Sequence, residues 1–102
     1  MADPLITVAR FLQPTFEALA GGVADPVVRR SDRADAQVNG SLAVAKSLGK
    51  RPREIAEQVL ATADLSAMCT ATEIGGPGFI NLTFSPTFLA TELAAAMRSE
   101  EH

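Results

Sequence analysis

Apolar side chains at helical spacing predict a first helix near the start of this chain. They recur every three or four positions, the period of one face of an α-helix, at Leu5, Val8, Leu12, Phe16 and Leu19. Asp3 followed by Pro4 is a typical helix start, because the carboxylate caps free amides and proline is tolerated at the first helical position. Residues 21–22 are both glycine and end the run. Pro14 removes one amide from this helix, so a kink or a break is expected there.

A second helix is predicted after residue 35. Its apolar stripe consists of Val38, Leu42, Ala45 and Leu48. Asp32 or Asp35 is expected to cap its start, and Gly49 to end it. On this helix Asp35, Asn39 and Lys46 would share a polar face.

Two more helices are predicted, each opening on a proline. The helix from Pro52 carries the stripe Ile55, Ala56, Val59, Leu60 and Ala63, with Glu54 and Glu57 facing outward. The helix from Pro86, capped by Ser85, carries a stripe expected to be buried: Leu89, Leu93, Ala96 and Met97. It is expected to fray from Ser99 to His102.

Alternating side chains predict strands in the remainder of the chain. Residues 68–74 and 79–84 form the clearest hairpin, because the glycine- and proline-rich residues 75–78 between them are typical of a turn. Ile80, Leu82 and Phe84 should point toward the helices, and Asn81 and Thr83 away from them. Residues 27–30 indicate an edge strand. The predicted fold is therefore α+β, one domain over residues 1–102, with a small antiparallel sheet and about four helices packed on one face.

The inventory of reactive groups argues against catalysis within these residues. The chain has one His, His102, and one Cys, Cys69. A zinc cluster, a nucleophile with an imidazole base and an internal disulfide are therefore all excluded. Cys69 is expected to be a small buried side chain. No apolar run is long enough to span a bilayer and no export signal is present, so we expect a cytoplasmic protein without a membrane partner.

The charge is distributed unevenly along the chain. Seven of the nine basic residues and only two acids lie at positions 29–53, which gives this window a net charge of +5 and the rest of the chain −8. Such a field attracts a polyanion to one face and repels it from the others.

Within the basic window, two features indicate phosphate groups and base edges, and so a nucleic acid, as the polyanion. Lys50, Arg51 and Arg53 crowd a helix start, where the helix dipole disfavours cations, so we expect either a bound phosphate or an ion pair between Arg53 and Glu57 to compensate. Gln37 and Asn39 each carry an amide that can donate to and accept from a base edge. The alternative is that these polar side chains only cap the second helix.

Four blocks of residues together resemble one known family. They are 35–40 (Asp-Ala-Gln-Val-Asn-Gly), 45–50 with Ala45-Lys46 and Leu48-Gly49-Lys50, 52–56 (Pro-Arg-Glu-Ile-Ala) and 76–81 (Gly-Pro-Gly-Phe-Ile-Asn). In order and spacing they are similar to the N-terminal additional domain of bacterial arginyl-tRNA synthetases, over nearly the whole chain. The parent enzymes ligate arginine to tRNA with ATP and Mg. Their catalytic and anticodon-binding domains have no counterpart in this chain, and neither does their His-x-Gly-His ATP signature.

The resemblance implies an α+β module that packs against the catalytic domain and contacts the D-loop at the outer corner of tRNA(Arg), with no DNA ligand. Gln37 and Asn39 would lie at the nucleotide-contacting surface, and Asp35 would hold their segment in shape. The family usually has an aromatic residue where this chain has Ala36, so a loop nucleotide has no ring to stack on at this position. Either that contact is lost or a phenylalanine elsewhere in the chain substitutes for it. The expected tRNA contacts are Arg33, Asp35, Gln37, Asn39, Lys46, Lys50, Arg51 and Arg53. This domain is expected to hold no catalytic residue, cofactor or metal.

A second function class fits the same charge pattern. A free-standing protein-interaction or dimerisation module would use the basic face to meet an acidic protein. Salt dependence separates the two classes, because phosphate contacts weaken steeply with salt and an apolar interface does not.

Overall fold

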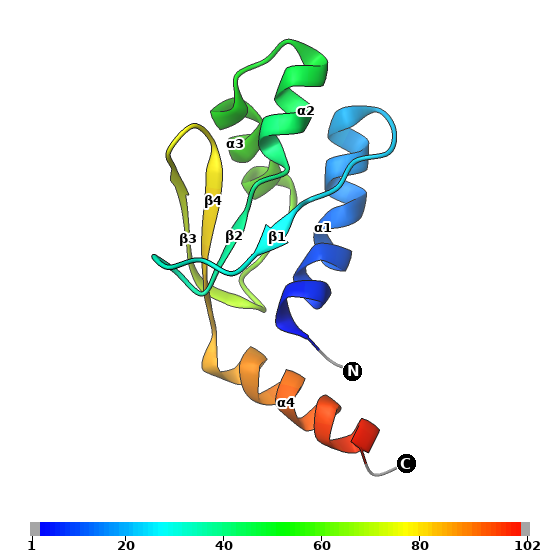
Figure 1. The fold of residues 1–102 in the computed structure, drawn as a ribbon, viewed down its shortest axis with the longest axis vertical. Coiled ribbons are helices and arrows are strands. Elements are labelled where there is room, and N and C mark those ends of the chain that lie inside the picture. Colours follow the sequence, from blue (N-terminus) through cyan, green and yellow to red (C-terminus); the bar gives the residue numbers. More distant parts are fainter. Residues whose placement is uncertain (1–2, 101–102) are drawn as a thin grey trace.

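A computed structural model describes residues 3–100 of the chain, and within them four helices and four strands (Figure 1). In chain order they are α1 (Pro4–Ala20), β1 (Val28–Arg29), β2 (Ala36–Val38), α2 (Ser41–Leu48), α3 (Pro52–Thr62), β3 (Cys69–Gly75), β4 (Phe79–Phe84) and α4 (Pro86–Glu100). The predicted α+β class is confirmed.

The four strands form one antiparallel sheet in the order β1-β2-β4-β3. The predicted hairpin is confirmed as β3 and β4, with the turn at residues 76–78. β1 is the predicted edge strand. β2 pairs with β4 although the two are far apart in sequence, with Gln37 opposite Asn81. β3 therefore forms the other edge of the sheet.

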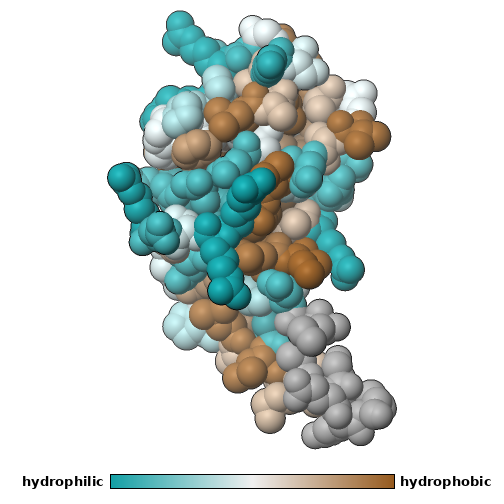
Figure 2. Space-filling model, viewed as in Figure 1, coloured by the Kyte–Doolittle hydropathy of each residue, from teal (hydrophilic) through white to brown (hydrophobic). Residues whose placement is uncertain are grey.

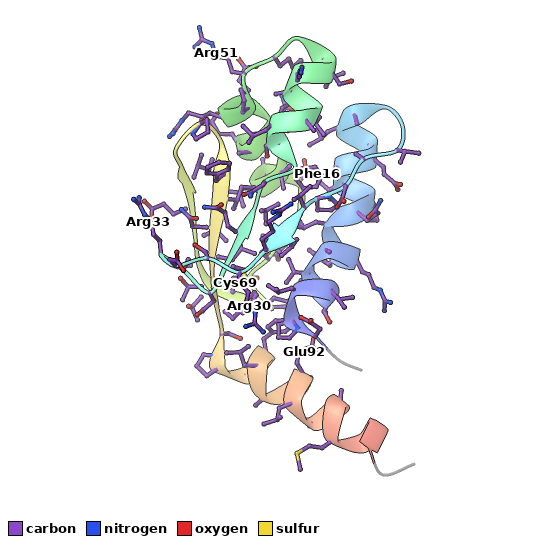
Figure 3. The ribbon with its side chains drawn as sticks, viewed as in Figure 1. Phe16, Arg30, Arg33, Arg51, Cys69 and Glu92 are labelled. Atoms are coloured by element: carbon purple, nitrogen blue, oxygen red, sulfur yellow. The ribbon has the colours of Figure 1, made fainter. Side chains whose placement is uncertain are left out.

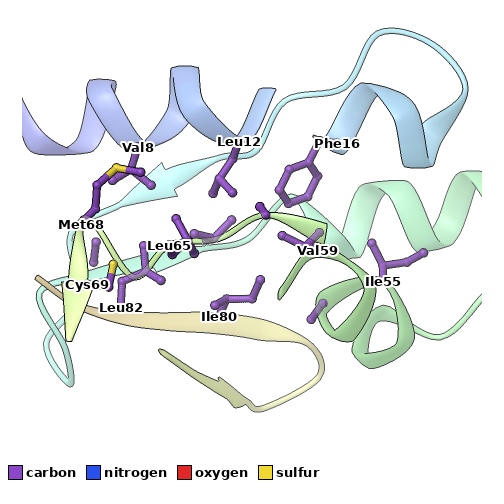
Figure 4. Close-up of a cluster of buried hydrophobic side chains, with 14 of the residues drawn as sticks. Val8, Leu12, Phe16, Ile55, Val59, Leu65, Met68, Cys69, Ile80 and Leu82 are labelled. Carbon is purple, nitrogen blue, oxygen red and sulfur yellow. The ribbon is translucent and has the colours of Figure 1, made fainter. Parts of the chain in front are cut away.

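The hydrophobic core lies between the sheet and the helices α1 and α3 (Figure 4). Ile80 and Leu82 of β4 are fully buried, as predicted. They face fully buried residues of the two helices, namely Val8, Leu12 and Phe16 of α1 and Ile55, Ala56 and Val59 of α3. Each large side chain removed from water in this way contributes about 1.5–3 kcal/mol. This burial holds both helices on a single face of the sheet.

The start and end of α1 follow the sequence signals. The Asp3 carboxylate accepts a hydrogen bond from the Leu5 N–H at 2.8 Å, and Gly21 ends the helix with a φ of 74°. The helix runs through Pro14 without a break. Tertiary packing compensates for the lost amide hydrogen bond, because Leu12 and Phe16 on either side of Pro14 are fully buried.

The predicted start of the second helix is wrong. Residues 36–38 form β2, and α2 begins only at Ser41, with no side-chain cap on its first turn. Val38 belongs to a strand instead of the helical stripe, and Leu48 is 39% exposed. The polar face predicted for Asp35, Asn39 and Lys46 therefore does not exist. The predicted end of the helix at Gly49 is confirmed by its φ of 67°.

The fourth helix is present, but its predicted buried stripe is wrong. Ser85 Oγ accepts a hydrogen bond from the Phe88 N–H at 2.9 Å, as a helix cap does. Leu89, Leu93 and Met97, however, are 40%, 63% and 58% exposed. Figure 1 shows the reason, because α4 extends away from the sheet beyond the end of β4. Fraying was expected from Ser99, but α4 continues to Glu100. The Ala96 side chain and residues 101–102 lie outside the described part of the chain.

Candidate nucleic-acid interface

The face of the sheet opposite α1 and α3, here called the open face, carries a row of polar side chains across all four strands. The register places Arg29 of β1 opposite Gln37 of β2, Gln37 opposite Asn81 of β4, and Asn81 opposite Glu73 of β3. The side chains of one such row point to the same side of a sheet. None of the four is buried. Figure 2 shows hydrophilic side chains across the middle of the molecule in the view of Figure 1.

A hollow of about 670 Å³ lies on the open face, and its lining includes Arg33, Gln37, Phe79 and Asn81. The Gln37 side-chain Nε2 donates a hydrogen bond to Asn81 Oδ1 at 3.0 Å. This bond orients both amides, so that the Gln37 Oε1 acceptor and the Asn81 Nδ2 donor are turned away from each other. The half-buried ring of Phe79 lies two residues before Asn81 on the same side of β4. An aromatic ring and two oriented amides thus share one hollow.

Asp35 fixes the strand that carries Gln37. Its Oδ2 accepts a hydrogen bond from the Phe84 N–H at 2.8 Å, and its own N–H donates to the Leu82 carbonyl at 3.0 Å. Asp35 therefore connects β2 to β4 through both its side chain and its backbone. Asp35 was expected to cap the second helix, and this contact is its actual local role.

Asn39 lies at a tightly packed corner between β2 and α2. Its N–H donates to the Val27 carbonyl at 2.9 Å, and the Gly40 N–H donates to the Pro26 carbonyl at 2.8 Å. Its side-chain Oδ1 is buried and has no hydrogen-bond partner among the described residues. The two candidate amides of the sequence thus differ, because Gln37 lines the hollow and the Asn39 acceptor lies beneath the surface.

The start of α3 offers few free amides to an anion. Pro52 has no N–H, and the N–H groups of Glu54 and Ile55 both point to the Arg51 carbonyl, at 3.0 and 3.3 Å. The Arg53 guanidinium donates to the Gly76 carbonyl in the β3–β4 turn at 3.0 Å. That contact, and not the predicted ion pair with Glu57, is the one the structure gives Arg53. A phosphate at this helix start would therefore have to be held by side chains.

The basic residues of positions 29–53 are all exposed, but they do not form one patch. Arg33 lies on the β1–β2 loop and Arg51 on the α2–α3 loop, and the β3–β4 turn lies between them in the view of Figure 3. Arg30, in contrast, lies toward α4. Lys46 is in the last turn of α2, where the helix dipole favours a cation. Lys50 is exposed on the α2–α3 loop beside Arg51.

Ala36 faces the core and not the open face. It is fully buried and lies opposite Leu82, which is also fully buried. A larger side chain at this position would enter the core, so its size bears on packing and not on nucleotide stacking. The aromatic ring that the open face does present is Phe79.

Four residues of this face were not among the site candidates predicted from the sequence: Arg29, Glu73, Phe79 and Asn81. The available signal was the alternation along residues 79–84, which places Phe79 and Asn81 on the side away from the core. The β2–β4 register, which brings Gln37 to Asn81, connects residues 44 positions apart and has no local signature.

No group of His, Cys, Asp and Glu that could hold a metal ion occurs within residues 3–100. Burial, with a smaller contribution from the Asp35 carboxylate, raises the pKa of the Cys69 thiol to about 11. A thiol with this pKa stays protonated and unreactive at neutral pH. In the same range, no helix has both the length and the apolar character needed to cross a bilayer.

Comparison with known proteins connects this chain to one family. Residues 7–84 match the family model described as the arginyl-tRNA synthetase N-terminal domain. The chain is 50% identical over 86 residues to arginine–tRNA ligases of Cronobacter sakazakii and Salmonella schwarzengrund, and 49% identical to that of Escherichia fergusonii. These matches cover 79% of this chain and 15% of each relative.

The fold resembles part of a solved structure. The crystal structure of arginyl-tRNA synthetase from Plasmodium falciparum aligns with a TM-score of 0.75, over 87% of this chain and 17% of that chain. The sequence identity is 15%, so this likeness concerns the fold.

Proposed function

This chain belongs to the family of arginyl-tRNA synthetase N-terminal domains, and on that premise we propose that its open face binds unpaired nucleotides of tRNA(Arg), in the D-loop at the outer corner. The observation that carries the proposal is the shared hollow of Gln37, Phe79 and Asn81. Proteins that recognise RNA by sequence usually read unpaired bases, stacking them on aromatic rings and bonding their exposed edges. Here Phe79 offers the ring and the Gln37–Asn81 pair offers an acceptor and a donor.

The charges around the hollow suggest how the RNA backbone runs. Arg33 lines the hollow beside Gln37, and Arg29 begins the polar row at the β1 edge. Glu73 lies at the opposite edge, on β3. Phosphates are attracted to the arginines and repelled by the carboxylate. We therefore place the backbone along the β1–β2 side, with the base directed toward Phe79.

Lys50, Arg51 and Lys46 are proposed as outlying phosphate contacts. Lys50 and Arg51 project from the loop before α3, and Lys46 from the end of α2. Asp35 acts indirectly, by holding β2 against β4. Asn39 is assigned to the edge of the interface, because its buried Oδ1 leaves only the amide nitrogen to meet a ligand.

The proposed parent activity is the ATP-dependent ligation of arginine to tRNA in the cytoplasm. This chain would place the tRNA, and a separate catalytic domain would hold ATP and Mg. The residues here do not fit ATP, since the single His is His102 and the glycine-rich segment at 75–78 is a hairpin turn instead of a phosphate loop before a helix. The exposed stripe of Leu89, Leu93 and Met97 on α4 is proposed to contact that catalytic domain.

Titration of the 102-residue chain with tRNA(Arg) at several salt concentrations tests the proposal. Affinity should fall by about 0.7 to 0.9 log units per log unit of salt for each phosphate contact. The double substitution Lys50→Glu with Arg51→Glu should weaken tRNA binding and reduce the dependence of affinity on salt. In the complete enzyme the same substitution should raise the KM for tRNA. Gln37→Ala should weaken binding to intact tRNA more than to a transcript with abasic D-loop positions. Equal losses on both RNAs would refute base reading.

An acidic protein remains the competing partner of the exposed basic residues at positions 29–53. The exposed apolar positions of α4, spaced four residues apart, favour a helix–helix contact and so a protein partner for that element. The protein-interaction or dimerisation function would be supported if the chain bound tRNA at no salt concentration and formed a dimer as its own concentration rose.

A further inference from the structure

The start of α3 and the β3–β4 turn are pressed against each other. A Cβ added to Gly78 would lie 2.6 Å from Pro52 Cβ and 2.7 Å from the Pro52 carbonyl carbon, which is closer than such atoms approach. Next to this contact, Arg53 Nη1 donates to the Gly76 carbonyl at 3.0 Å. Arg53, a basic residue at the start of α3, is thus attached directly to the β3–β4 turn.

The same turn supports the side chains of the proposed RNA site. A Cβ on Gly76 would lie 3.3 Å from Phe79 Cδ2, so the ring rests against the Gly76 backbone. A Cβ on Gly75 would lie 2.9 Å from Asn81 Nδ2, so the amide lies over Gly75. Any displacement of the turn therefore moves the surface on which the ring and the amide rest.

The turn needs an external support to hold one conformation. Gly76 and Gly78 have φ values of 52° and 144°, in the region that glycine enters readily and other residues rarely. Glycine also loses more conformational freedom than any other residue when it is fixed. A charged donor on the Gly76 carbonyl restricts this freedom.

We propose that Arg53 is a positioning residue for the RNA site. It holds the β3–β4 turn in the conformation that seats Phe79 and Asn81, and it does not itself contact a phosphate. The proposal rests on the proposed function for its effect on RNA, and on the turn geometry alone for its effect on Phe79. The hydrogen bond from Arg53 connects the start of α3 directly to the turn beside the hollow. Arg53 thus has a different role from Arg51, which is proposed as a phosphate contact.

The first measurement needs no RNA. With 4-fluorophenylalanine at position 79, Arg53→Gln should shift the fluorine resonance. It should also speed several-fold the amide exchange of Gly78, whose N–H donates to the Gly75 carbonyl at 3.2 Å. Arg51→Gln, which removes an equal charge two residues away, should leave both unchanged. An unchanged resonance and exchange rate in Arg53→Gln would overturn the proposal.

The second measurement uses tRNA(Arg) and the transcript with abasic D-loop positions. Arg53→Gln should reduce the preference for the intact RNA several-fold and leave the salt slope of binding unchanged. Arg51→Gln should reduce the slope and leave the preference unchanged. Gly78→Ala should match Arg53→Gln, because the added Cβ displaces the turn without removing a charge. A lower slope with intact preference in Arg53→Gln would make Arg53 a phosphate contact and overturn the proposal.

Failure of the proposed function itself has a different signature. The wild-type chain would then show no preference between the two RNAs, and the fluorine resonance and the Gly78 exchange rate would still decide whether Arg53 fixes the turn.

Discussion

The Asp35 carboxylate accepts a hydrogen bond from the Phe84 N–H at 2.8 Å, although the two residues are 49 positions apart. This bond and that from the Asp35 N–H to the Leu82 carbonyl join β2 to the last residues of β4. Gln37, two residues after Asp35, thereby comes to lie opposite Asn81. The stability of the fold and the geometry of the proposed site thus depend on the same contact.

Removal of this acceptor should destabilise the chain. We expect Asp35→Ala to lower the free energy of unfolding by about 1–3 kcal/mol, because the Phe84 N–H loses its partner. Asp35→Asn retains an acceptor oxygen and should lose less. Asp32→Ala, at an exposed carboxylate on the same loop, should change stability by less than about 0.5 kcal/mol. Urea denaturation measures all three, and equal values for Asp35→Ala and Asp32→Ala would contradict this role.

Gly40 is predicted to tolerate no side chain. A Cβ there would lie 2.7 Å from the Pro26 carbonyl oxygen and against the Asp25 carbonyl oxygen, both of which are backbone atoms. Gly40→Ala should therefore lower stability by about 1–3 kcal/mol through overpacking. Gly22→Ala is the matched control, since a Cβ at Gly22 meets nothing within 4 Å. Thermal denaturation that gives the same melting temperature for both variants would disprove the close approach.

Glu73 should weaken RNA binding in the wild-type chain. It is the acidic member of the polar row on the open face. Glu73→Gln removes a repulsive charge from that face and should increase the affinity for tRNA(Arg). Glu57→Gln removes the same charge from the exposed side of α3 and serves as the control. A larger gain from Glu57→Gln would place the RNA elsewhere.

The Cys69 thiol gives the folded state a specific dependence on pH. Its pKa is raised from the ordinary value of 9.0 to about 11, mainly by burial. Its contribution to stability is complete below pH 9 and is lost as the pH rises toward 11, because the unfolded chain releases the proton first. Cys69→Ala should remove this component. The difference in unfolding free energy between wild type and variant should therefore narrow over that pH range, and a constant difference would contradict the raised pKa.

The hairpin and several helix termini could be predicted because their signals are local. Asp3, Gly21, Gly49 and Ser85 cap helices through bonds to residues a few positions away. β2 could not be predicted in this way. Val38 fits a helical stripe as well as a strand, and only the pairing of β2 with β4 decides between them.

The exposed stripe of α4 shows a second limit of sequence patterns. Leu89 and Leu93 have the spacing of a buried helix face, and that spacing identifies an apolar face without identifying what covers it. The candidate site has the same limit. Gln37 was identified from its residue type, whereas its partners Asn81 and Phe79 became evident from the register of distant strands.

The most direct test of an RNA-binding open face is a titration of the isotopically labelled chain with the D-arm hairpin of tRNA(Arg), followed by NMR. The largest shift changes are expected at Arg33, Gln37, Phe79 and Asn81, with little change along the exposed side of α1. Changes confined to α1 or α4, with the four residues of the hollow unaffected, would exclude RNA binding at the open face.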